Sequence, residues 1–230
     1  MKKDNLFWIF PIVYLGIFIV LVSFDRHKGM GPVVTDADGN TYTTVTIGRQ
    51  VWFKENLKTT RYRNGDTIPT TGRSDADISA EANPKYYWMC DPEPQKDRRS
   101  GCLYTWYAVM DSRNICPPGW HIPENAEWME LTDYLEGSAH STMYDGETEA
   151  IHWINLDADE TSRSDQAGSP CGWRSKIGTF YSTSGSGYWW SSTEYTETRA
   201  ARFSLYFTER SAELSGLTKS QGLSVRCIKD

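Results

Sequence analysis

Residues 102–135 read CLYTWYAVMDSRNICPPGWHIPENAEWMELTDYL, and this stretch carries both helical patterns of the chain. In its first part, apolar residues recur with the spacing i, i+3, i+4 and i+7, which predicts an amphipathic helix that ends near Asp111. These residues are Leu103, Trp106, Tyr107 and Met110. In its last part, a second helix is predicted over residues 124–135. The apolar face of this second helix consists of Trp128, Leu131 and Leu135.

The second helix has a recognisable signal at each end. Asn125 is the better N-cap candidate, because an Asn side chain accepts hydrogen bonds from the free N–H groups of the first turn. Glu124 and Glu127 suit the positive end of the helix dipole. Gly137 comes just after the periodic residues and predicts the C-terminal end of the helix.

The segments on either side predict short strands. Asp38-Gly39-Asn40 is a tight-turn signal, and residues 42–47 after it alternate between two faces. Further short strands are expected at residues 51–53, 86–89, 179–181, 187–193, 200–207 and 222–228. These elements predict one α+β domain, with two helices, short antiparallel strands and long loops.

The N-terminus has a different composition. Residues 6–24 read LFWIFPIVYLGIFIVLVSF, and nineteen helical residues span about 28 Å, close to the thickness of a bilayer core. Because no A-x-A cleavage pattern follows, we expect residues 1–29 to be an uncleaved signal-anchor, with a cleaved signal peptide as the alternative. The remaining domain, residues 30–230, is then exported. It is either anchored in the inner membrane and faces the periplasm, or lies at the cell surface.

The charge of the exported part argues against one class of partner. The whole chain has a formal net charge of −6, and residues 30–230 alone carry −8. Proteins that bind nucleic acid present a basic surface to the phosphate backbone. We therefore expect no nucleic-acid partner.

The five cysteines are Cys90, Cys102, Cys116, Cys171 and Cys227. None forms a C-x-x-C pair, so zinc or thioredoxin-like chemistry has no support, and in an exported domain disulfides are the default expectation. Cys90 and Cys102 flank a polar insertion and could close its base. A bridge from mid-chain to the predicted last strand is also open, and Cys171 is then the odd thiol.

Five motifs together resemble the Fibrobacter succinogenes major paralogous domain. They are VTDADGNTYTTVTIGRQVWFKENLKTTRYRNGDTIP at residues 34–69, CLYTWYAVMD at 102–111, CPPGWHIPENAEWMELTDYL at 116–135, GYWWSSTEY at 187–195 and GLSVRCIKD at 222–230. The resemblance implies an exported surface domain with a C-type-lectin-like fold. It also implies a long-range disulfide between Cys116 and Cys227. The family often has Ser or Thr where Glu124 stands, so its usual capping box is expected to be lost here.

Candidate ligand-binding residues lie in the motif at residues 187–195. Tyr188, Trp189, Trp190 and Tyr195 could form a stacking platform for a sugar ring, and Glu194 is a further candidate ligand residue. Strand alternation sends Trp189 and Trp190 to opposite faces, so at least one of them is expected in the core. Asp36, Asp38 and Asn40 have the spacing of a calcium loop. However, the Gly and the bidentate Glu that such a loop requires are replaced, which favours a simple turn. No metal or other cofactor is predicted.

No catalytic residue is predicted either. His121, His140 and His152 show no partner pattern for a nucleophile and base, and His121 follows Trp120 in what reads as a structural motif. The sequence therefore favours a non-catalytic binding module for a surface glycan or protein. Two alternatives stay open: an enzyme on a fold like that of the formylglycine-generating enzymes, or a purely structural surface protein.

Overall fold

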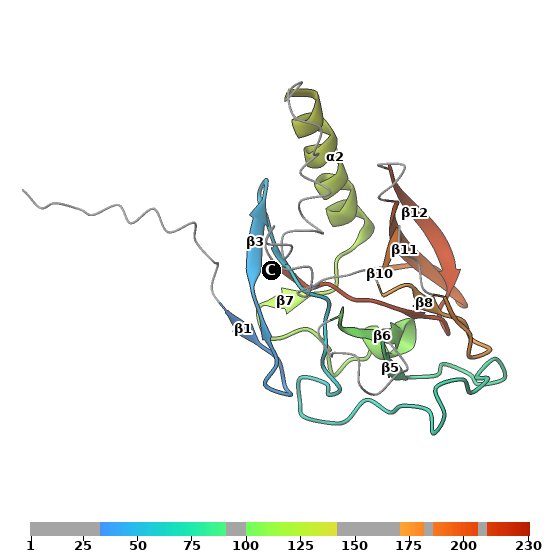
Figure 1. The fold of residues 1–230 in the computed structure, drawn as a ribbon. Coiled ribbons are helices and arrows are strands. Elements are labelled where there is room, and N and C mark those ends of the chain that lie inside the picture. The colour runs from blue at the N-terminus through green and yellow to red at the C-terminus, as the bar shows by residue number, and fades with distance from the viewer. Residues whose placement is uncertain (1–32, 91–99, 142–170, 182–185, 207–210) are drawn as a thin grey trace, which may run out of the picture.

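The computed structural model describes residues 33–90, 100–141, 171–181, 186–206 and 211–230. These residues contain fourteen strands and two helices, of which the first helix has only four residues. The predicted α+β, C-type-lectin-like fold is therefore wrong, because the described domain is mostly β and consists of antiparallel sheets. Figure 1 shows helix α2 standing beside the long strands β11 and β12, with the shorter strands around its base.

The elements form four sheets, with the strand orders β1-β2, β3-β4-β14-β7, β5-β6-β13-β8-β9 and β10-β11-β12. The strands are β1 (Val34–Thr35), β2 (Thr41–Tyr42), β3 (Thr44–Ile47), β4 (Gln50–Phe53), β5 (Tyr87–Met89), β6 (Cys102–Thr105), β7 (Trp120–His121), β8 (Trp173–Arg174), β9 (Phe180–Tyr181), β10 (Ser186–Thr196), β11 (Arg199–Tyr206), β12 (Ser211–Thr218), β13 (Gly222–Leu223) and β14 (Ile228–Lys229). The helices are α1 (Trp106–Val109) and α2 (Asn125–Ser141).

The first part of the first predicted helix is a strand. Leu103 lies in β6, where it pairs with Trp88 of β5, and only residues 106–109 are helical. All four residues of β6 are buried, so both faces of this central strand are covered. A strand that is covered on both faces has apolar residues at nearly every position. Residues three and four positions apart are then apolar too, which imitates the spacing of a helix.

Helix α2 is the second predicted helix, but its ends differ from the prediction. The N–H of Glu124 donates to Glu127 Oε2 at 2.9 Å, which is half of a capping box, so the helix keeps part of the arrangement expected to be lost. Asn125 is the first helical residue and does not cap; its N–H donates to Thr193 Oγ1 of β10 at 3.0 Å. Gly137 lies inside the helix.

The β10-β11-β12 sheet packs one face against α2. Trp189, Phe203 and Leu214 stand in register across its three strands and belong to one core cluster with Trp128 of the helix. The rings of Trp128 and Phe203 are stacked, with centroids 4.3 Å apart. Strand β12 was not predicted, because its sequence SAELSGLT is short of large apolar side chains. Burial of the α2-facing side chains fixes the orientation of the whole sheet.

Two disulfides join distant parts of the chain. Cys116 and Cys227 are bonded, with Cα atoms 6.0 Å apart, which confirms the pair that the family resemblance implied. The second bridge joins Cys90 to Cys171, so the predicted Cys90–Cys102 pair is wrong, and Cys171 is not the odd cysteine. Cys102 remains a buried thiol, and its sulfur lies 3.6 Å from the carbonyl oxygen of Lys58 and 3.8 Å from Met89 Sδ.

The predicted membrane segment, residues 6–24, lies outside the described residues, as does the rest of the predicted signal region, residues 1–29. Among the described residues, no helix is long and apolar enough to cross a membrane.

Candidate functional site

The two tryptophans predicted to bind a ligand are in the core. Trp189 and Trp190 are both 0% exposed. The indole N–H of Trp189 donates to Asn56 Oδ1 at 2.8 Å, and that of Trp190 donates to the carbonyl oxygen of Tyr104 at 2.7 Å. Alternation does send them to opposite faces of β10, but both faces are covered at this point. Neither indole presents a ring face to a ligand.

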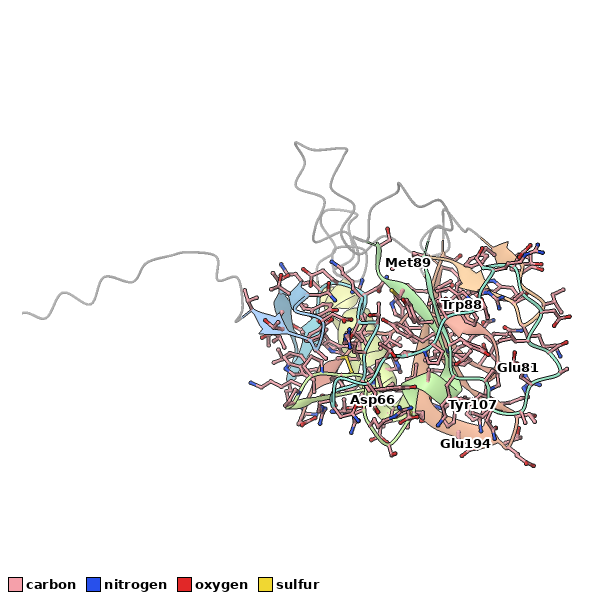
Figure 2. The ribbon with its side chains drawn as sticks, turned by 90° about the horizontal axis from the view of Figure 1, so that it is seen from below. Asp66, Glu81, Trp88, Met89, Tyr107 and Glu194 are labelled. Carbon is pink, nitrogen blue, oxygen red and sulfur yellow. A yellow bond between two sulfur atoms is a disulfide. The ribbon has the colours of Figure 1, made fainter. Side chains whose placement is uncertain are left out.

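Glu194, the third predicted ligand residue, is the charge partner of a buried lysine. The side chain of Lys219 is 3% exposed, and its ammonium group is paired with the Glu194 carboxylate and donates to the carbonyl oxygen of Glu197 at 2.9 Å. The Lys219 Nζ atom also lies 4.4 Å from the centre of a Trp106 ring, a cation–π contact. Figure 2 shows Glu194 beside Tyr107, the other aromatic residue that Lys219 approaches. The position of Glu194 is explained by this pairing.

His121 lies between two carboxylates. Its Nδ1 atom is 2.7 Å from Asp230 Oδ1, and its Nε2 atom is 2.9 Å from Glu127 Oε1. Burial alone would lower the pKa of His121, but its hydrogen bonds to Asp230 and Glu127 outweigh burial and raise the pKa above 6.5, its ordinary value. Both ring nitrogens are occupied by carboxylates, so the imidazole has no free nitrogen to act as a base toward a nucleophile. The side chains of His140 and His152, the other two histidines considered for catalysis, lie outside the described part of the chain.

A charged cleft of about 350 Å³ opens beside this histidine. Glu127 and Asp230 line it, together with Arg49, Glu130 and Lys229. Arg49 is already paired with Glu130 at 3.1 Å. Glu127 and Asp230 contact His121, so four of the five charged side chains that line the cleft already have a charged or histidine partner.

The predicted turn at residues 36–40 uses its own carboxylates. Asp36 accepts hydrogen bonds from the N–H groups of Asp38 and Asn40 and from the hydroxyl of Tyr42. Asp38 is paired with Arg61 and accepts hydrogen bonds from Thr60. These bonds hold the turn against the following loop, which accounts for the acidic spacing without a metal ion.

A further group of polar and aromatic side chains occupies the face of the β10-β11-β12 sheet turned away from α2. We call it the tyrosine–arginine face, and its residues are Tyr188, Arg202, Ser204, Tyr206, Glu213 and Ser215. Alternation places them there, because their strand neighbours Trp189, Phe203, Leu205 and Leu214 belong to the core cluster on the α2 side. Tyr188, Arg202 and Tyr206 are half-buried, and Glu213 is exposed.

Contacts within the face hold its side chains in place. The Arg202 guanidinium lies 5.2 Å from the centre of the Tyr188 ring, and its Nε donates to Ser215 Oγ at 3.1 Å. The rings of Tyr188 and Tyr206 meet edge to face with centroids 6.4 Å apart. The Tyr206 hydroxyl donates to Glu213 Oε2 at 3.2 Å.

Of the residues of this face, only Tyr188 belongs to the predicted sugar platform. The sequence also held a signal for the β11 residues, because Arg202, Ser204 and Tyr206 alternate with Phe203 and Leu205, which is the period of a strand with one core face. Glu213 could not be assigned to this face from the sequence, because neither strand β12 nor its pairing with β11 was predicted.

Comparison with known protein families gives one finding. The model of the Fibrobacter succinogenes major domain matches residues 45–229, which is most of the chain. The chain belongs to the Fibrobacter succinogenes major domain family. The match runs from β3 through β14, so this family domain includes α2, both disulfides and the tyrosine–arginine face. Neither the curated proteins nor the solved structures yield a match to the chain.

Proposed function

We propose that the chain is an exported, non-catalytic binding module that holds a component of the cell envelope, a glycan or a protein, against the tyrosine–arginine face. The observation that carries the proposal is the two-sided character of the β10-β11-β12 sheet. One face is buried against α2, whereas the other gathers half-buried Tyr188, Arg202 and Tyr206. Tyrosine and arginine are enriched where proteins recognise partners, because they combine large contact area with polar groups.

The two disulfides support export. Disulfides persist in oxidising compartments outside the cytoplasm, and the bridges Cys116–Cys227 and Cys90–Cys171 join residues 111 and 81 positions apart. The apolar run at residues 6–24 and the net charge of −8 on the rest agree with a domain tethered at, or released from, the inner membrane, in the periplasm or at the cell surface.

A second candidate function is catalysis, and His121 favours it, because a histidine bonded to carboxylates beside a cleft is a common catalytic arrangement. The weakness of this candidate is chemical. Glu127 and Asp230 occupy both ring nitrogens, and the bonds of His121 tie β7 to the start of α2. A structural role for His121 explains these contacts without a substrate.

The proposal is tested by binding to cell envelopes. Full-length protein in lipid nanodiscs is fluorescently labelled and titrated onto envelopes of the producing cells, with empty nanodiscs as the control. We expect saturable binding that is lost when the disulfides are reduced and the domain is unfolded. Binding that rises linearly without saturation, or equals that of empty nanodiscs, contradicts the proposal.

A further inference from the structure

The tyrosine–arginine face has an ordered row of groups across its three strands. Tyr188 of β10 stands opposite Ser204 of β11, and Ser204 stands opposite Glu213 of β12. Adjacent strands are about 4.8 Å apart, so the row from Tyr188 to Glu213 extends over about 10 Å. Arg202 and Tyr206 flank it on β11, one on each side of Ser204. An aromatic ring, a hydroxyl and a carboxylate thus lie side by side.

This face lacks the apolar centre of a stable protein–protein interface. Arg202 and Glu213 supply one positive and one negative charge, so the six residues are neutral together. Stable protein interfaces have a buried apolar centre. The large apolar residues exposed in the described part of the chain are Val33, Met110, Met129, Tyr134, Ile177, Tyr181 and Tyr195. None of them belongs to the tyrosine–arginine face, which leaves it without such a centre.

Ser204 supplies an observation that points to a hydroxylated ligand. The residue is 0% exposed, and its Oγ atom has no hydrogen-bond partner among the residues that the structure describes. A buried polar atom without a partner is uncommon and destabilising. The hydroxyl stands between Tyr188 and Glu213, where it can both donate to and accept from a hydroxyl of a ligand once the flanking tyrosine side chains shift.

We infer that the ligand of the tyrosine–arginine face is a neutral glycan. Tyr188 and Tyr206 offer ring faces to the apolar side of a sugar, Arg202 and Glu213 bond its hydroxyl groups through planar polar ends, and Ser204 bonds a hydroxyl that reaches between the rings. This inference rests on the proposed binding function and names the ligand class and the residues that select it.

The test uses the same nanodisc titration on envelopes treated with periodate, which cleaves the vicinal diols of sugars, or with a broad protease. Two variants change the face: Tyr206→Ala removes a ring, and Glu213→Gln alters an exposed side chain with little risk to folding. Tyr195→Ala is the matched control. It removes an exposed tyrosine of the same sheet on the α2 side, where a Cβ at Gly216 would lie 2.9 Å from Tyr195 Cδ2.

We expect binding to be lost after periodate and kept after protease. Tyr206→Ala and Glu213→Gln should each weaken it roughly fivefold or more, and Tyr195→Ala should leave it unchanged. Loss after protease with resistance to periodate would overturn the glycan ligand while the binding function stands. Periodate-sensitive binding that neither face variant weakens would overturn the assignment to this face. Absence of saturable binding by the folded protein would overturn both the inference and the proposed function.

Discussion

Tyr206 of β11 and Glu213 of β12 are joined diagonally across adjacent strands, with the tyrosine hydroxyl 3.2 Å from Glu213 Oε2. The bond orients the Tyr206 ring, which meets the Tyr188 ring edge to face. These contacts order two rings and connect all three strands of the proposed binding face before any ligand is present.

The same contact predicts a measurable titration. Burial and the hydrogen bond to Glu213 both raise the pKa of Tyr206 above its ordinary value, since each disfavours the phenolate. Glu213→Gln should lower this pKa part of the way, with burial accounting for what remains. Ultraviolet absorbance titration measures it, and the difference from Tyr206→Phe isolates the signal of this one tyrosine. An unchanged pKa in Glu213→Gln would show that the contact is absent in solution.

The disulfide pattern predicts one cysteine outside the two bridges. Unfolded, unreduced protein should contain one reactive thiol per chain, and non-reducing peptide mapping should assign it to Cys102. Cys102→Ser should abolish the signal with both bridges intact. Cys116→Ser should lower the free energy of unfolding by about 2–5 kcal/mol, because it opens the longer covalent loop. A Cys90–Cys102 peptide in the map would contradict the structure.

His121 predicts a dependence of stability on pH. Its pKa is raised in the folded state, so the protonated imidazole stabilises the fold fully below the unfolded pKa of about 6.5. This stabilisation is lost as the pH rises through the folded pKa. The difference in unfolding free energy between the natural protein and His121→Gln should therefore shrink as the pH rises from about 6 to about 9. Urea unfolding at several pH values measures it, and a difference that grows with pH would refute the assignment.

Glu194 predicts a separation of stability from binding. Glu194→Gln leaves the buried ammonium of Lys219 without its carboxylate and should lower the free energy of unfolding by roughly 1–3 kcal/mol. Envelope binding by the folded variant should stay unchanged. Glu197→Gln is the matched control, because only the backbone carbonyl of Glu197 contacts Lys219. Weaker envelope binding by the folded Glu194→Gln variant would show that Glu194 belongs to the ligand site after all.

The sequence predicted the features that depend on neighbouring residues, such as turns and the start of a helix. The turn at Asp38-Gly39-Asn40 forms, with Gly39 at a φ of +82°, and α2 begins within one residue of the predicted start. The family motifs also implied the Cys116–Cys227 bridge correctly.

Features set by tertiary packing were not predictable in this way. The apolar spacing around Leu103 fits a helix and a doubly covered strand equally well, and only the neighbours of β6 decide between them. Cys90 is closer in sequence to Cys102, yet it bonds Cys171, and the sulfur atoms of Cys90 and Cys171 both lie close to the carbonyl oxygen of Ser100, at 3.6 and 3.4 Å. The burial of Trp189 and Trp190 depends on α2 and β6, which approach β10 from opposite sides.

The most direct test of the central claim is hydroxyl-radical footprinting of the full-length protein, free and bound to cell envelopes. Oxidation of Tyr188 and Tyr206 should fall on binding, while that of Tyr181 and Tyr195, which are exposed elsewhere, should stay constant. Such protection would show that the tyrosine–arginine face meets the ligand. Unchanged oxidation of Tyr188 and Tyr206 in the bound protein would contradict the account.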